Sequence, residues 1–317
     1  DVYDQDWVGT FPYYWVYLTR PDESMLISGN WFAAKDYETK RNLLARVFWP
    51  VANVAARKQD PYLQRYANYA AKWIGNDRVE AWNVIWYNPK LPERPLSELP
   101  HDRYFHSKTP IGPSESLVVF RTGWDENAVI VTVDGSDWFS HHDHYDAASF
   151  TIFYRADLAI DPGYTDNELD SWRFFRRTAA HNSLIVDAPE VASEWANHNW
   201  GYDGGGQRLP ITVNRPRSVE QYFSWKHPDY PNTSLFEMAN VTDYESDGNL
   251  GYVCVDATLA YRASQLTRFM RHVAFLKPDI LVVYDVVDTP AGREPQWLLQ
   301  TATEPRVYDG GFVVTNG

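Results

Sequence analysis

The sequence predicts an α+β protein of two domains, helical to about residue 105 and built from antiparallel strands over residues 106–317. Two observations predict this class. Apolar residues recur with helical spacing in the first hundred residues, and from about Ser116 the spacing changes to strand-like alternation without intervening helices. A chain of 317 residues exceeds the usual size of one compact core. Closely spaced strands without crossover helices favour a sandwich over a parallel sheet.

The clearest predicted helix follows Asp60, which has the side chain of a good N-cap and precedes a proline suited to the first turn. Its apolar face continues to Ile74, and Gly75 is expected to end it. The stretch before it, residues 36–58, is also helical in pattern but contains Pro50, which predicts a kink or a break near Trp49. The proline-rich segment from Asn88 to Pro113 is expected to be an ordered connection.

Predicted strands follow from alternating apolar runs: SLVVFRTGW, NAVIVTVDGS, SFTIFYRA, HNSLIVDA, PITVNRPRSV, VCVDATLAY and VAFLKPDILVVYDVV. The last run should turn at Lys277, Pro278 and Asp279. The terminal DGGFVVTNG resembles a hairpin in progress, so we expect the sandwich to continue beyond residue 317.

Composition excludes several classes of protein. No apolar run is long enough to span a membrane, and the N-terminal sequence DVYDQDWVG lacks the features of a signal peptide. A formal net charge of −13 argues against nucleic acid as a partner. The single cysteine, Cys254, excludes an internal disulfide and is expected to be a buried thiol, which leaves the cellular compartment open.

The chain is rich in aromatic residues, with 14 Trp and 21 Tyr. Such side chains offer flat faces that stack on sugar rings, although core packing is the commoner role for any single Trp. The tryptophans in polar loops are the candidates for sugar contact: Trp138, Trp172, Trp195 and Trp200.

The stretch SHHDHYDAASFTIFY places three histidines directly before a predicted strand. Residues i and i+2 of a strand share a face, so His142 and His144 would project together from one face. Asp161 ends a later apolar run and His181 begins another. Two imidazoles and a carboxylate suit Zn²⁺ or a similar divalent ion. The alternative from spacing alone is a set of histidines hydrogen-bonded in a polar cleft.

The segments HHDHYDAASFTIFYRADLAIDPGY and RRTAAHNSLIVD resemble the signature of the heparinase II/III-like polysaccharide lyases, a family that includes oligo-alginate lyases and dermatan sulfate epimerases. The similarity is strongest from about Val129 to Asp187. It implies the C-terminal helices of an incomplete α/α toroid followed by a large antiparallel β super-sandwich.

The resemblance also implies roles for individual residues. His142 matches the catalytic histidine, and His144, Asp161 and His181 match the ligands of a metal ion, here expected to be zinc. Partners that orient these ligands are expected among Asp143, Asp146 and Asn182. His141 is expected to be structural.

The implied reaction is β-elimination on a uronate, in which the C5 proton is removed and the 4-linked sugar leaves. The family's catalytic tyrosine normally lies upstream of the sandwich, and its motif is not recognisable in this sequence. Tyr13 and Tyr14 are candidates, but packing on an ordinary aromatic helix face is the favoured role for both. Residues 1–317 alone are therefore expected to show little turnover.

Contacts with an anionic sugar are assigned to Arg173, Arg177, Trp138, Tyr164 and Trp200, with a structural role left open for Arg177.

The preferred function is a lyase acting on an acidic, uronate-containing polysaccharide. Alternatives are a uronate C5-epimerase of the same family and a non-catalytic carbohydrate-binding sandwich with a structural metal. A cupin-like metalloenzyme fits poorly, because the helices and the long β region exceed that small barrel. The resemblance implies a periplasmic or secreted location, and pairing into a homodimer is left open.

Overall fold

The computed structural model describes residues 2–25, 37–74, 81–106, 115–138, 143–163, 170–189, 204–208 and 236–315. The chain divides into two compact units. The first comprises Asp1–Ile27, Phe32–His101 and Gly123–Ala128, and the second comprises Ser28–Trp31, Asp102–Thr122 and Val129–Gly317. None of the helices in the described ranges is long and apolar enough to cross a membrane.

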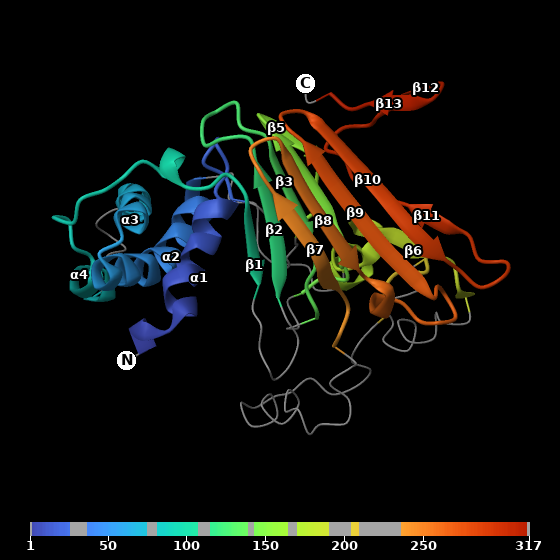
Figure 1. The fold of residues 1–317 in the computed structure, drawn as a ribbon, viewed down its shortest axis with the longest axis horizontal. Helices are drawn as coiled ribbons and strands as arrows, with labels where there is room; N and C mark the ends of the chain where they lie inside the picture. The colour runs from blue at the N-terminus through green and yellow to red at the C-terminus, as the bar shows by residue number, and fades with distance from the viewer. Residues whose placement is uncertain are drawn as a thin grey trace. The chain divides into compact units, whose positions relative to one another are not determined.

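Helices make up the first unit, coloured blue to teal in Figure 1. They are η1 Val2–Asp4, α1 Asp6–Leu18, α2 Tyr37–Lys58, α3 Pro61–Ile74, α4 Ala81–Trp86 and η3 Leu96–Glu98. The predicted start of α3 is confirmed, because Asp60 Oδ1 accepts the backbone N–H groups of Tyr62 at 2.9 Å and Leu63 at 3.0 Å. The other carboxylate oxygen of Asp60 accepts the hydroxyl of Tyr13 at 2.8 Å, which ties α1 to the start of α3.

Of the kink or break predicted near Trp49, the break is wrong, because α2 runs through Pro50 without interruption. The kink stays a prediction. Proline removes one backbone hydrogen bond from a helix, and packing of the surrounding turns can compensate for that loss. Here Val47, Phe48, Val51 and Ala52 on either side of Pro50 are all buried. Tertiary burial therefore outweighs the local preference.

Two antiparallel sheets dominate the second unit (Figure 1). The first has the order β1-β2-β3-β4-β5, with β1 Arg103–His106, β2 Ser116–Arg121, β3 Ile130–Asp134, β4 Phe150–Tyr154 and β5 Ala156–Ala159. The second has the order β10-β9-β8-β7, with β7 Asn240–Ser246, β8 Leu250–Asp256, β9 Arg268–Leu276 and β10 Ile280–Asp288.

Smaller elements complete the described part of this unit. Strand β6 Leu184–Val186 pairs with β11 Pro295–Trp297, and β12 Arg306–Tyr308 pairs with β13 Gly311–Val313. Short helical turns are η4 Ser171–Phe175, η5 Thr178–Ala180 and η8 Thr258–Ala260.

Both large sheets contribute to one apolar core, which includes Phe120 and Val131 from the first and Val253, Phe269 and Phe275 from the second. All five side chains are buried. Two antiparallel sheets sharing such a core form the layered arrangement that the alternating sequence pattern predicts.

Most of the predicted strands are confirmed, including the β9–β10 hairpin at Lys277–Asp279 and the hairpin near the end of the sequence. The predicted run at 210–219 lies outside the described residues. The sequence pattern does not predict strands β1 and β7. Strand β1 falls in the segment expected to be a connection, and β7 has a largely exposed sequence, NVTDYES, with little apolar alternation.

The two sheets are in close contact where Gly251 of β8 meets the ring of Phe120 of β2. A Cβ atom at position 251 would overlap that ring. Gly251→Ala should therefore lower the free energy of unfolding by about 1–3 kcal/mol, the usual cost of forcing extra volume into a packed core. Chemical denaturation of the purified variant measures this loss.

The matched control is Gly248→Ala, since a Cβ at that exposed position meets nothing within 4 Å. It should change the free energy of unfolding by less than about 0.5 kcal/mol. Equal stability of the two variants would show that the close approach of the sheets is not a constraint.

Candidate metal centre

The first of the predicted metal ligands, His144, is buried in the segment between β3 and β4. This segment is not part of a strand, since β4 begins only at Phe150. The prediction that His144 projects from a strand face beside His142 is therefore wrong for His144, and His142 lies outside the described residues. A tight turn intervenes, in which Ser149 N–H donates to the Asp146 carbonyl at 2.7 Å.

Asp161 and His181 lie at strand ends, as predicted. Asp161 follows β5, and its Oδ1 accepts the backbone N–H of Gly163 at 2.8 Å, which orients the carboxylate. His181 lies between η5 and β6 and is fully buried. Its Nδ1 donates to Asp161 Oδ2 at 3.1 Å, and its Nε2 donates to the carbonyl of Phe175 at 3.1 Å.

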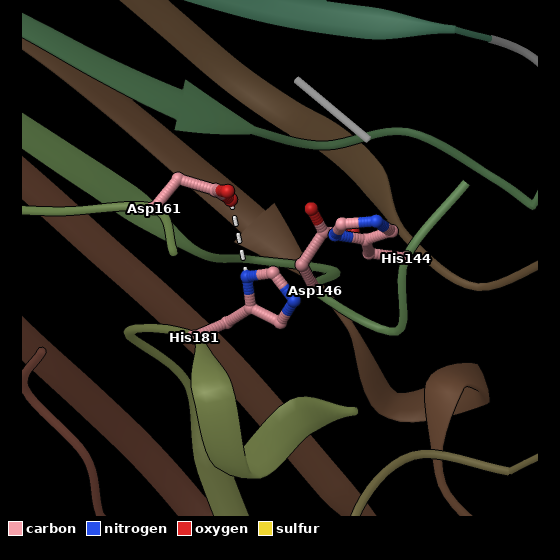
Figure 2. Close-up of side chains that lie close together, drawn as sticks. All are labelled: His144, Asp146, Asp161 and His181. Carbon is pink, nitrogen blue, oxygen red and sulfur yellow. Dashed lines mark hydrogen bonds and ion pairs between the residues drawn. The ribbon is translucent and has the colours of Figure 1, made fainter. Parts of the chain in front are cut away.

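Four side chains converge here: one ligand atom from each of His144, Asp146, Asp161 and His181 lies within 4.8 Å of the others. Figure 2 shows them pointing toward one another, with the dashed line joining Asp161 and His181. The rings of His144 and His181 are 5.2 Å apart between centroids. The structure thus brings together the three ligands expected from the sequence and adds Asp146, which was expected only to orient them.

Charge interactions within the group shift its ionisation. Burial opposes protonation of His181, yet the Asp161 carboxylate outweighs it, and the pKa of His181 lies above its ordinary value. Burial likewise would raise the pKa of Asp161, but the neighbouring His181 lowers it below its ordinary range. For Asp146, burial comes first and the nearby carboxylates of Asp161 and Asp143 add to it, so its pKa rises to about 6 despite the opposing effect of His181.

Hydrogen bonds from outside the group hold the segment that carries His144 and Asp146. Thr178 Oγ1 donates to the Tyr145 carbonyl at 2.8 Å and accepts the Gln207 N–H at 2.8 Å. The Gln207 side chain bonds both backbone groups of Ala147, at 3.1 and 2.9 Å. The sequence pattern does not reveal Gln207, because a buried glutamine 60 residues away in the chain carries no local signal of this contact.

These residues fit a divalent cation. Two imidazoles and two carboxylates are the nitrogen and oxygen donors that Zn²⁺ and similar borderline ions prefer. Burial is the first cause of the raised pKa of Asp146, and repulsion from the Asp161 carboxylate adds to it, against the opposing effect of His181. A cation bound between the carboxylates of Asp146 and Asp161 would offset the repulsion between them.

Other residues expected at the site lie elsewhere or outside the described part of the chain. Trp138 is 5% exposed and packs in the core against Phe236, with ring centroids 6.1 Å apart, so it offers no face to a sugar, contrary to its predicted role. Arg173 is exposed, whereas Arg177 is buried, which favours the structural role left open for it. The residues outside the described part are His141, His142, Tyr164, Trp195 and Trp200.

The fold and site define a protein with a helical unit and an antiparallel β unit that carries a partly buried candidate metal centre. Residues 116–315 match the family model described as heparinase II/III-like, C-terminal. The chain therefore belongs to the heparinase II/III-like family. No curated protein sequence matches it significantly.

Solved structures show the same fold. The heparan sulfate lyase HepC from Pedobacter heparinus is 18% identical, with a TM-score of 0.51, and the match covers 92% of this chain and 34% of that one. A heparinase III structure is 12% identical, with a TM-score of 0.54, covering 93% of this chain and 34% of its own. The sequence thus spans about a third of the length of these structures.

Thr178→Val should destabilise the protein, because it keeps the side-chain shape but removes the hydroxyl that bonds the Tyr145 carbonyl and the Gln207 N–H in a buried place. An unsatisfied buried polar group costs about 1–3 kcal/mol. Denaturant unfolding gives the change. Thr267→Val is the control, since that exposed hydroxyl bonds only the Asp288 carbonyl, at 3.3 Å. Indistinguishable losses for the two variants would contradict the bracing role of Thr178.

Proposed function

We propose that this chain is part of a polysaccharide lyase that cleaves a uronate-containing acidic polysaccharide by β-elimination. The observation that supports this most is the convergence of His144, Asp146, Asp161 and His181 in a member of the heparinase II/III-like family. One of the similar solved structures is, by its name, a lyase that acts on heparan sulfate.

In the proposed reaction, His142 exchanges a proton with the sugar. In the sequence it precedes His144 by two residues. A divalent ion, when bound, would neutralise the carboxylates of the group and fix the geometry of the segments that hold it. Arg173 is exposed in the π-helical turn η4, and we propose that its guanidinium binds an anionic group of the sugar.

We further propose that the helices to about residue 105 belong to an incomplete α/α toroid and that the sheets belong to a β super-sandwich. Support comes from the helical first unit, the two-sheet second unit and the family match over residues 116–315. A periplasmic or secreted location stays a prediction from the family resemblance.

The test of the function is incubation of the complete gene product with heparan sulfate, hyaluronan and alginate while the ultraviolet absorbance of an unsaturated uronate is followed. At least one substrate should give the chromophore. His142→Ala should lower the rate by at least about a hundredfold, the usual contribution of a general acid or base. His101→Ala, which changes an exposed histidine of the helical unit, should keep full activity.

The outcomes separate the alternatives. Inversion at C5 without a chromophore would identify an epimerase, and binding without any reaction would identify a carbohydrate-binding module. Full turnover by the His142→Ala variant would end the catalytic assignment of that residue.

Zinc should stabilise the chain, because an ion that binds only the folded state adds its binding free energy to folding. At a free zinc concentration about a hundred times the Kd, the gain should be about 2.7 kcal/mol, measured as a rise in Tm. His181→Ala should abolish the gain and His101→Ala should keep it. A zinc-dependent rise of the same size in His181→Ala would exclude the proposed ligand set.

A further inference from the structure

Arg271 is a fully buried cation of β9 that the proposed function does not use. Its Nε and Nη2 donate to both carboxylate oxygens of Asp285 on β10, at 2.8 and 2.7 Å. Its Nη1 donates to two backbone carbonyls, those of Ala148 at 2.7 Å and Asn182 at 2.6 Å. One guanidinium thus joins the second sheet to two segments outside it.

Those two segments carry the candidate metal ligands. Ala148 follows Asp146 in the turn before β4, and Asn182 directly follows His181. The planar, forked geometry of a guanidinium sets the directions of its bonds, so the two carbonyls are fixed relative to each other. Arg271 therefore fixes the spacing between the segments that bring Asp146 and His181 together.

The backbone at Ala148 needs such support. Its φ is 61°, in the left-handed region that residues with a Cβ rarely adopt. Its N–H donates to the Asp134 carbonyl at 3.1 Å, and its own carbonyl accepts from Arg271. The unfavourable conformation is thus held from both sides.

Asn182 extends the same network to the third ligand segment. Its side-chain amide donates to the carbonyls of Phe150 at 2.7 Å and Ile160 at 3.0 Å, and its Oδ1 accepts the Gln300 N–H at 2.5 Å. Ile160 directly precedes Asp161. Arg271 therefore bonds the carbonyl of Asn182, and the side chain of Asn182 in turn bonds the backbone next to Asp161.

We propose that Arg271, paired with Asp285, is a positioning residue that preassembles the metal centre through the backbone of Ala148 and Asn182. This inference rests on the proposed metal site. It predicts that loss of Arg271 weakens the binding of zinc, although removal of a positive charge near a cation site would by itself strengthen it. A positioning role for Arg271 therefore predicts a higher Kd for zinc when Arg271 is lost, whereas a purely electrostatic effect predicts a lower Kd.

The experiment titrates zinc into the 317-residue chain and its variants by chelator competition. Arg271→Met should raise the Kd for zinc about 10–100-fold, the range found when residues supporting metal ligands are lost. Arg271→Lys keeps the charge but not the fork, so it should also raise the Kd, and it provides the test if the methionine variant fails to fold.

Lys277→Met is the matched control. Lys277 is another cation of the β9–β10 hairpin with a buried side chain, paired with Asp102 and bonded to the Asp247 carbonyl at 3.1 Å, away from the ligand segments. It should lower Tm and leave the Kd within about twofold of the parent.

Each outcome separates the claims. An unchanged or lower Kd in folded Arg271→Lys would overturn the positioning role while leaving the metal site intact. Absence of zinc binding by the parent chain would instead overturn the metal site, and with it this inference. An equal rise in the Kd for zinc in Lys277→Met would show that general destabilisation causes the rise in the Arg271 variants, and would also overturn the proposal.

Discussion

The second unit is constrained above all by the convergence of two buried imidazoles and two half-buried carboxylates in one place. Such groups are tolerated inside a protein only if hydrogen bonds and opposite charges replace the water they lose. For Asp161 and His181 these include the bond between the two side chains, the Gly163 N–H and the Phe175 carbonyl. Thr178, Gln207 and Asn182, far away in the sequence, bond the backbone beside the site. These contacts hold the segments between the strands that carry the site.

The balance of charge around the group is negative. Asp134 adds a third carboxylate near Asp146, and its pKa lies well above the ordinary value because of burial first and Asp146 second. The chain as a whole carries a formal charge of −13. A divalent cation at the group would relieve the local repulsion, and an acidic polymer approaching the chain would have to be met by cations placed locally, since the overall field repels it.

Features that depend on local patterns could be predicted from the sequence. The cap at Asp60, the alternation in β2, β3, β9 and β10, and the strand-end positions of Asp161 and His181 all follow from residue type and spacing. Residue type and position suggested a metal site at His144, Asp161 and His181 but left a hydrogen-bonded polar cleft open, and the family resemblance favoured the metal.

Features that depend on tertiary contacts could not be predicted. The helix through Pro50 continues because its neighbours are buried, and the position of His144 depends on a turn with Ala148 in a left-handed conformation. Arg271 and Gln207 lie in sequence without a motif, and only the folded chain shows that both contact the ligand-bearing segments. Long-range hydrogen bonds to backbone carbonyls leave no periodic trace in the residues that make them.

The central claim is that these four side chains form a metal centre, and diffraction from zinc-soaked crystals at the zinc absorption edge tests it most directly. We predict one anomalous peak at about 2.0–2.2 Å from ligand atoms of His144, Asp161 and His181. Asp146 should either bind the ion or lie beside it. Absence of a peak there, with His181 still bonded to Asp161 and Phe175, would contradict the claim.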